Sequence, residues 1–216
     1  MSLTDQSTRI RAGEELDAAV IDPYLKAHIP GLEGTPKISQ FPGGASNLTY
    51  LIEYPRQEFV LRRPPFGHKA KSAHDMGREY RILNQLNAGF PYCPKAYLYC
   101  TDESVIGAEF YVMERVKGII LRAELPPELN LDEQQTRSLC KSFIDKFVEL
   151  HNVDYAACGL ADLGRPDGYV QRQIAGWTDR YEKALTPDAP LWEPVKAWLK
   201  DKQPADHHKP DRKSVV

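Results

Sequence analysis

One stretch of the chain, residues 41–63, combines residue types that could bind an anion. Two adjacent glycines, Gly43 and Gly44, are followed by the small polar side chains of Ser46 and Asn47. Adjacent glycines let the backbone approach a ligand closely and turn its N–H groups toward a negative charge. The pattern predicts a glycine turn that covers phosphate groups. The alternative is a hairpin turn that binds nothing, because a short glycine motif does not specify a ligand.

A cation and a carboxylate later in the chain are candidates for the same site. Arg62 stands two residues after Val60, so both side chains are expected on one face of a strand, under the glycine turn. Glu79 stands beside the apolar stripe of a helical segment. The alternatives are a solvated arginine at a strand end and a solvated helix carboxylate, both of which are common on protein surfaces.

The segments that must position these residues have an α+β pattern. Apolar and β-rich runs separated by turn residues predict three strands between residues 36 and 63, and two more at 94–100 and 108–114. A helix is expected over residues 73–88, because Met76 and the apolar residues after it recur at helical spacing. The glycine turn would then lie between the first two strands.

The segments before this strand-rich middle are polar or helical. Residues 1–13 are polar and are expected to be loose. A helix is expected over residues 14–29, with a kink or break at Pro23.

Beyond residue 114 the strand pattern stops and helical spacing takes over. Helices are expected over residues 131–153, 167–185 and 191–199. The change predicts an N-terminal lobe over residues 1–116 and a helical lobe over residues 117–216.

Composition narrows the classes of partner. A net charge of −2 in 216 residues gives no overall field for nucleic acid or an anionic membrane. No apolar run approaches the roughly 18 residues of a membrane span. The cysteines lack CxxC spacing, so we expect reduced, mostly buried thiols of a cytoplasmic protein at Cys93, Cys100, Cys140 and Cys158. The pair His207-His208 lacks matching metal ligands, and no metal site is expected there.

The order of a glycine turn, a cation on the third strand, a helix carboxylate and a strand that enters a linker resembles the aminoglycoside phosphotransferase family. The resemblance is to its branch associated with acyl-CoA dehydrogenases, and it extends from about Leu16 to the C-terminus. The matching segments are GGASNLTYL, FVLRRPP, REYRIL, DESVIG and FYVMERVKG. The resemblance implies a protein-kinase-like α+β fold, with an antiparallel sheet lobe and an incomplete helical lobe. It also implies ATP and Mg²⁺ as cofactors and a small-molecule substrate.

The resemblance assigns roles around the phosphates residue by residue. Gly43, Gly44, Ser46 and Asn47 would form the hairpin over the phosphates. Arg62 stands where the family usually has lysine, and Glu79 becomes its expected ion-pair partner. An arginine keeps the charge of lysine, but it is longer and carries a planar fork of donors.

The same resemblance assigns the residues around the adenine. Met113 would stand at the back of the base, and Leu48 and Val60 would sandwich it. The backbone C=O of Glu114 and the N–H of Val116 would meet the adenine edge.

The family's catalytic segment, a His-x-Asp…Asn loop followed by a metal-binding Asp, has no counterpart in these 216 residues. Its spacing places it directly after Val216, because residues 214–216 are similar to the strand that leads into it. We therefore expect a truncated chain with no catalytic residue and no metal ligand, which holds only the nucleotide-binding part. Its uncovered helical lobe is expected to expose an apolar patch beside Phe143, Phe147 and Leu150, which favours self-association.

Two functions stay open on the sequence. The first is an ATP-dependent phosphotransferase that acts on a small-molecule hydroxyl. A hydroxyacyl thioester is the first expected acceptor, ahead of an aminoglycoside, because of the acyl-CoA dehydrogenase branch and because no strongly acidic stretch suits a polycationic drug. The second is a non-catalytic kinase-like module that binds nucleotide or a partner, which the arginine at position 62 favours.

Overall fold

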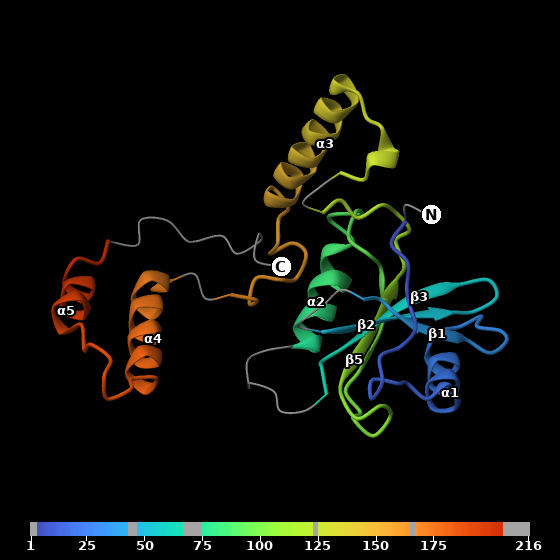
Figure 1. Ribbon diagram of the computed structural model, residues 1–216, viewed down its shortest axis with the longest axis horizontal. Helices are drawn as coiled ribbons and strands as arrows, with labels where there is room; N and C mark the ends of the chain where they lie inside the picture. The colour runs from blue at the N-terminus through green and yellow to red at the C-terminus, as the bar shows by residue number, and fades with distance from the viewer. Residues whose placement is uncertain (1–3, 43–46, 67–74, 123–124, 165–166, 205–216) are drawn as a thin grey trace. The chain divides into compact units, whose positions relative to one another are not determined.

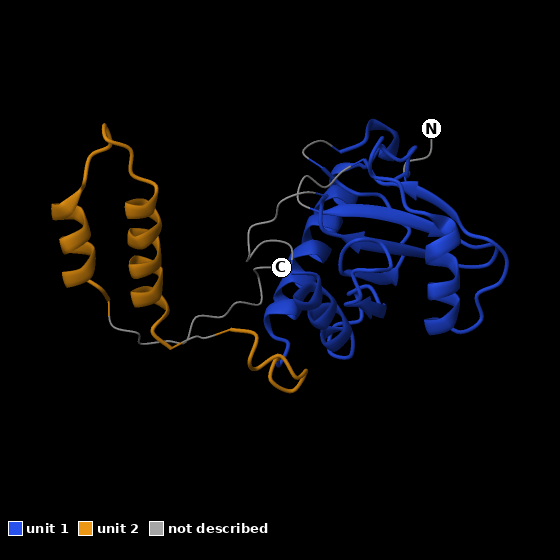
Figure 2. Ribbon diagram, turned by 90° about the horizontal axis from the view of Figure 1, so that it is seen from below, with its two compact units in different colours: residues 1–154 blue, residues 155–216 orange. Residues whose placement is uncertain are grey.

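The computed structural model describes residues 4–42, 47–66, 75–122, 125–164 and 167–204. The chain divides into two compact units, residues 1–154 and 155–216 (Figure 2). The first unit contains all the strands described and the helices up to residue 151, and the second contains the last two helices.

The first unit is built on a five-stranded antiparallel sheet with the order β1-β2-β3-β5-β4 (Figure 1). The strands are β1 Lys37–Gln40, β2 Leu48–Glu53, β3 Glu58–Arg63, β4 Ala96–Cys100 and β5 Phe110–Glu114. Each lies inside a segment whose β-branched, aromatic and apolar residues predict a strand, so the five predicted strands are confirmed. β3, which carries Arg62, lies at the centre of the sheet.

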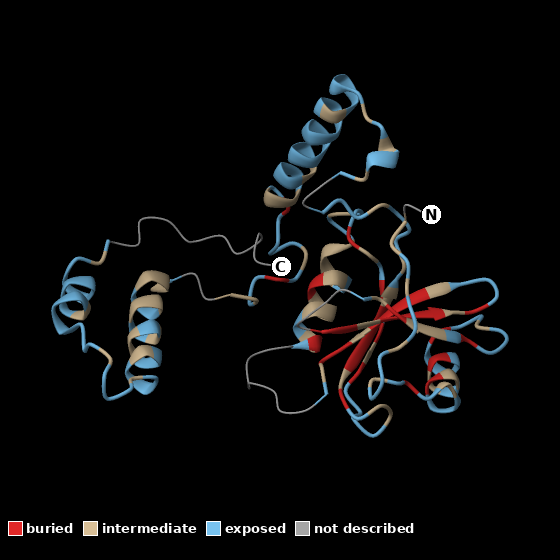
Figure 3. Ribbon diagram, viewed as in Figure 1, coloured by how far each residue is buried: buried red, intermediate tan, exposed pale blue. Residues whose placement is uncertain are grey.

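One face of the sheet packs against helix α1, Ala18–His28. Side chains of a strand alternate between its two faces, and Tyr50, Leu61 and Val112 all point to this one. Ile21 and Leu25 of α1 are completely buried against them (Figure 3). This apolar core holds the sheet in place, and the residues on the opposite face of the sheet take their positions from it.

The opposite face carries helix α2, Met76–Leu86, over β4 and β5 (Figure 1). The helix begins at Met76 because the side chain of Asp75 accepts a hydrogen bond from the N–H of Arg78 at 2.8 Å. Gly77 lies so close to β4 that a Cβ atom there would stand 2.8 Å from the hydroxyl oxygen of Tyr99. The close approach brings the first turn of α2, and with it Glu79, down onto the sheet.

Helix α1 is shorter than its sequence pattern predicts. Asp17 accepts a hydrogen bond from the N–H of Ala19 at 2.8 Å, and this N-cap starts the helix at Ala18. Glu14 lies before the helix, where its carboxylate accepts a hydrogen bond from Gln40 at 2.6 Å. The helix does not break at Pro23, because α1 continues through this residue to His28, and the alternative of a kink there stays a prediction.

The N-terminal segment is attached to the edge of the sheet, and the expectation that it is loose is wrong for the described part. Thr8 and Gln40 exchange two backbone hydrogen bonds, of 2.7 and 3.0 Å. Asp5 donates its backbone N–H to the C=O of Gly118 at 3.3 Å. The reason is that β1 is an edge strand, and an edge strand presents unpaired backbone groups that another segment can satisfy.

The remaining elements are helical, as the sequence pattern predicts. They are a 3-10 turn η1 Pro127–Leu129 and the helices α3 Glu133–His151, α4 Tyr169–Lys183 and α5 Glu193–Asp201. None of the three helices contains a buried residue (Figure 3). The compact units separate after Asp154, whereas the last strand ends at Glu114, so a lobe boundary near residue 116 stays a prediction.

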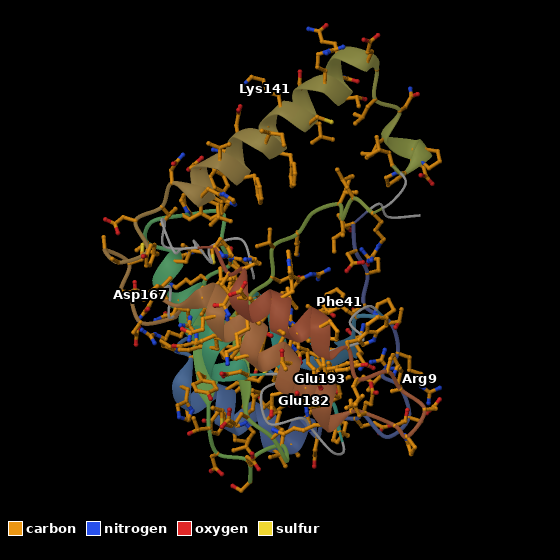
Figure 4. The ribbon with its side chains drawn as sticks, turned by 90° about the vertical axis from the view of Figure 1, so that its left-hand side faces the viewer. Arg9, Phe41, Lys141, Asp167, Glu182 and Glu193 are labelled. Carbon is orange, nitrogen blue, oxygen red and sulfur yellow. The ribbon has the colours of Figure 1, made fainter. Side chains whose placement is uncertain are left out.

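The second unit is a pair of helices joined by charged contacts. The ammonium group of Lys196 on α5 lies 3.0 Å from Glu182 on α4 and 2.6 Å from Glu193, and Figure 4 labels both carboxylates. The same pair of helices lines an open, mainly apolar groove of about 600 Å³, and Trp177 and Trp192 are among the lining residues.

The four thiols are free, but they are less uniformly buried than expected. Cys93 and Cys100 are buried, Cys158 is half-buried and Cys140 is exposed. Among the described residues, no helix is both long enough and apolar enough to cross a bilayer.

Candidate functional site

The α2 face of the sheet carries a polar row that crosses its three central strands. Arg62 on β3 faces Thr49 on β2 at one side and Tyr111 on β5 at the other. Glu79 on α2 lies against this row. The site is thus assembled from segments that are far apart in sequence and are held together by strand register and by the docking of α2.

The predicted ion pair between Arg62 and Glu79 is confirmed. Arg62 Nε lies 3.4 Å from Glu79 Oε2, and about a third of each side chain is exposed to solvent. A pair with this exposure contributes only about 0–1 kcal/mol to stability. The pair therefore contributes little to holding the fold together.

Two neutral groups make the short hydrogen bonds to the carboxylate of Glu79. The hydroxyl of Tyr111 donates to Oε2 at 2.9 Å, and the amide of Asn47 donates to Oε1 at 2.9 Å. Asn47 directly follows residues 43–46 in the sequence, and this bond joins Asn47 to α2. Both carboxylate oxygens are occupied without using the guanidinium of Arg62.

The guanidinium of Arg62 keeps most of its hydrogen-bonding capacity. Its Nε is buried and makes no hydrogen bond, although Glu79 Oε2 stands 3.4 Å away. In the part of the chain that the structure describes, no residue pairs with either terminal Nη group. Arginine has five N–H donors in a planar fork that matches phosphate oxygens, so this fork is available to an anion.

Tyr111 is fixed in its protonated form. Burial raises the pKa of Tyr111 well above its ordinary value of 10.0, and the negative charge of Glu79 raises it further. The positive charge of Arg62 opposes this rise without cancelling it. At physiological pH the hydroxyl therefore remains a hydrogen-bond donor to Glu79.

An apolar row lies next to the polar one. Val60, which is 7% exposed, faces Leu51 on β2 and Met113 on β5. Met113 is half-buried and stands one residue before the end of β5. The structure thus brings Val60 and Met113 together on the face of Arg62, as the resemblance implies.

Leu48 does not belong to this row, and the expectation that it and Val60 enclose one base is wrong. Leu48 faces Arg63 on β3, whereas Val60 faces Leu51. Positions 48 and 51 differ by three, an odd number, so their side chains point to opposite faces of the sheet. Leu48 is buried in the core on the α1 face, and Leu51 takes its place beside Val60.

Two residues with predicted adenine contacts, Glu114 and Val116, lie at the end of β5 and in the linker after it. Glu114 is exposed, and its carboxylate accepts a hydrogen bond from the N–H of Lys95 at 3.2 Å. Val116 is 65% exposed, and no described residue accepts a hydrogen bond from its N–H. The adenine contacts expected of Glu114 and Val116 stay a prediction.

Three predicted residues of the glycine turn, Gly43, Gly44 and Ser46, lie outside the described residues, as do His207-His208 and residues 214–216. Among the described residues, no group of three or more His, Cys, Asp or Glu side chains is arranged to hold a metal ion.

Sequence reasoning missed two residues of this region. Tyr111 reads as one more apolar residue of a strand, and only its register with Arg62 shows that its hydroxyl reaches Glu79. Arg63 reads as the solvated half of an Arg-Arg pair, but it is 2% exposed, donates to the C=O of Ile106 at 2.8 Å and stacks on Phe66. The sequence offered one signal for this burial. Arg63 stands two residues after Leu61, so the two side chains share a face of the strand, and Leu61 belongs to a continuous apolar run.

The chain is similar to a phosphotransferase family and to longer proteins named acyl-CoA dehydrogenases. A family model described as "Phosphotransferase enzyme family" matches residues 37–216. Acyl-CoA dehydrogenase family member 11 is 34% identical over 95% of the chain in Gallus gallus and 35% identical over 86% in Homo sapiens. These matches span 27% and 24% of the two relatives, so the chain corresponds to about a quarter of their length.

A solved structure is similar in fold as well as in sequence. It comes from Ralstonia eutropha and is assigned as an aminoglycoside phosphotransferase. It superposes with a TM-score of 0.64 at 32% identity, covering 86% of this chain and 53% of the solved one.

Proposed function

The chain belongs to the phosphotransferase enzyme family, and on that premise we propose that it binds ATP for transfer of the γ-phosphoryl group to a small-molecule hydroxyl. The observation that carries the proposal is the Arg62–Glu79 pair between β3 and α2, with the fork of Arg62 unpaired among the described residues. Kinase-like folds use such a pair to position nucleotide phosphates under a glycine-rich hairpin.

The two rows of the sheet suit the two ends of a nucleotide. The phosphates would lie at the Nη groups of Arg62, and the base would lie against Val60 and Met113. Residues two apart on a strand are separated by about 7 Å, which places these contacts on different parts of one ligand. The C=O of Glu114 and the N–H of Val116 would meet the adenine edge. In this arrangement the linker after β5 separates a sheet lobe, 1–116, from a helical lobe, 117–216.

Gly43, Gly44 and Ser46 retain their proposed role over the phosphates. Asn47 is bonded to Glu79, so its proposed role is to hold this turn against α2. ATP thus fits the donors that the chain provides. The family generally uses Mg²⁺, but the described residues form no cluster of ligands for it, so we assign it no ligand among them and route no step through it.

We propose a hydroxyacyl thioester as the acceptor. The support is the similarity to proteins named acyl-CoA dehydrogenases, whose substrates by that name are acyl thioesters. An aminoglycoside is the second candidate, which the assignment of the solved structure favours. The free thiols support a cytoplasmic location, where cysteines remain reduced.

Calorimetric titration of the chain with ATP and with adenosine tests the nucleotide site. We expect tighter binding of ATP, because only ATP offers phosphates to Arg62. Equal affinities for ATP and adenosine, or no binding of either, would contradict the proposal. Phosphoryl transfer is tested with labelled ATP in a polypeptide extended through the family's catalytic loop, against hydroxyacyl thioesters and aminoglycosides. Labelling of aminoglycosides alone would contradict the thioester assignment.

A second function is a kinase-like module that binds nucleotide without chemistry. The observation in its favour is Arg62 at the position where the family usually has lysine. The two functions separate in the extended polypeptide, where ATP binding without transfer to any acceptor would favour the module.

A further inference from the structure

The short contacts of Glu79 are made with neutral donors rather than with the cation beside it. Tyr111 and Asn47 each donate a hydrogen bond of 2.9 Å, whereas Arg62 Nε stands 3.4 Å away. A charge-assisted N–H···O bond has a length of about 2.7–2.9 Å, so the ion pair is stretched. The buried Nε makes no hydrogen bond at all.

Arg62 and Tyr111 compete for one oxygen of this carboxylate, because both approach Oε2. An arginine beside a carboxylate whose oxygens are both unoccupied closes its fork on the two of them. Here Tyr111 takes one lone-pair position on Oε2 and Asn47 takes one on Oε1, so the guanidinium meets a rival donor at both oxygens of that closed arrangement. Strand register fixes the competition, since Tyr111 faces Arg62 directly across β3 and β5.

We propose that Tyr111 and Asn47 are positioning residues that hold Glu79 so that Arg62 presents both Nη groups to a nucleotide phosphate. The inference rests on the proposed function. It explains how arginine serves where related kinases usually have lysine: lysine must use one nitrogen for both partners, whereas arginine turns Nε to the carboxylate and its fork to the phosphate.

The substitution Tyr111→Phe tests the role of the hydroxyl with little change in shape. Without this donor, Arg62 is expected to close on the vacated Oε2 and withdraw its fork from the phosphate. We expect the Kd for ATP to rise about three- to tenfold, the range for loss of one hydrogen bond, and the Kd for adenosine to stay within about twofold. Calorimetric titration of the 216-residue chain measures both.

A matched control is available on the neighbouring strand. Tyr99 on β4 faces Tyr111, and its hydroxyl donates to the carboxylate of Glu109 at 2.7 Å. Tyr99→Phe therefore removes the same kind of bond from the same sheet, with no bond to Arg62 or Glu79. We expect it to leave the ratio of ATP to adenosine affinity unchanged.

The dependence on Arg62 separates positioning from direct contact. In an Arg62→Ala background, neither Tyr111→Phe nor Asn47→Ala should weaken ATP binding further, because the fork they hold is gone. A further loss from Asn47→Ala there would show that Asn47 contacts phosphate itself and would overturn its positioning role. Arg62→Lys is a second variant in the wild-type background, and we expect about a tenfold weaker Kd for ATP because its single nitrogen goes to Glu79.

The results distinguish this inference from the proposed function. If the wild type binds ATP and Tyr111→Phe behaves like Tyr99→Phe, the inference fails and the proposed function stands. ATP affinity of Arg62→Lys equal to that of the wild type would likewise overturn the division of roles within arginine. If the wild type binds no ATP, the proposed function fails and the inference fails with it.

Discussion

The guanidinium of Arg115 lies 2.5 Å from the carboxylate of Glu58, and this contact joins the linker after β5 to the start of the strand that carries Arg62. Lys117 reaches the other oxygen of the same carboxylate at 2.9 Å. The hydrogen bond from Lys117, followed by that from Arg115, lowers the pKa of Glu58 below its ordinary value of 4.5, against the opposing effect of burial. These two ion pairs thus hold the linker after β5, which we propose contacts the adenine, against the start of β3.

We expect Glu58→Gln to lower the free energy of unfolding by about 1 kcal/mol at pH 7. A carboxyl whose pKa is depressed in the folded state stabilises the fold above its ordinary pKa, and this contribution disappears as pH falls through the lowered folded value. The difference between wild type and variant should therefore be full at neutral pH and should shrink below pH 4.5. Urea titrations over a pH series measure it.

Glu103→Gln is the control for this prediction, because Glu103 is exposed and makes no ion pair to a described residue. An equal pH dependence in both variants would argue against a special role for Glu58.

Arg62→Ala is expected to affect binding and leave stability almost unchanged. If the guanidinium contacts phosphate, the loss should weaken ATP binding by about 1–3 kcal/mol, the range for a charge-assisted contact. Adenosine, which lacks phosphates, should bind as before. Titration of both ligands checks this, and equal losses for the two would mean that Arg62 acts through folding.

Arg63→Ala should do the reverse, although the two arginines are sequence neighbours. Arg63 lies on the core face and donates to the C=O groups of Ile106 and Pro64, at 2.8 and 3.2 Å. Its removal leaves buried acceptors unsatisfied and a cavity beside Phe66, at a cost of about 2–4 kcal/mol. Denaturant unfolding of the two arginine variants side by side measures the contrast, and equal stabilities would refute it.

The sequence predicts the elements of this fold better than it predicts the facing of their side chains. Strands and helices follow from local periodicity, so the five strands and α2 lie within a few residues of the expected ranges. The face of the sheet on which a side chain lies depends on the residue that stands opposite it on the neighbouring strand. That register is set by strand pairing. Leu48 illustrates this: it stands three positions from Leu51 and so lies on the opposite face, and only the register shows that Leu51 is the residue beside Val60.

The same limit explains what was found and missed at the site. Arg62 and Glu79 could be paired in advance because their order along the chain resembles a known arrangement. Tyr111 could not, because its link to Glu79 requires β5 to lie beside β3, although β4 precedes β5 in the chain. The attachment of Thr8 to Gln40 uses backbone groups alone, so no side-chain pattern announces it.

Thr8→Pro tests whether the N-terminal segment stabilises the sheet. Proline has no N–H, so the 2.7 Å bond to the C=O of Gln40 is lost, and Gln40 is almost completely buried. We expect a loss of about 1–3 kcal/mol, the cost of an unsatisfied buried acceptor. Thr8→Ala keeps both backbone bonds and should cost much less. Thermal unfolding of the two variants decides, and equal melting temperatures would show that the bridge contributes nothing.

Helix α3 exposes an apolar stripe that we expect to drive association between copies of this chain. Phe143 is 66% exposed and Phe147 is 44% exposed, and their rings stack with centroids 6.2 Å apart. Ile144 and Val148 extend the stripe, each more than half exposed, whereas Leu150, which was expected in the patch, is half-buried. Contiguous exposed apolar side chains of this kind favour self-association, because contact removes them from water.

Phe143→Glu places a charge in the centre of this stripe and should reduce association, since burying an unpaired carboxylate is costly. The measurement is sedimentation velocity over a range of protein concentrations, in which the wild type should shift to larger species as concentration rises. Ser142→Glu adds the same charge at the preceding exposed position of α3 and serves as the control, with association close to that of the wild type. A wild type that stays monomeric throughout, or two variants that weaken association equally, would show that the stripe around Phe143 is not a contact surface.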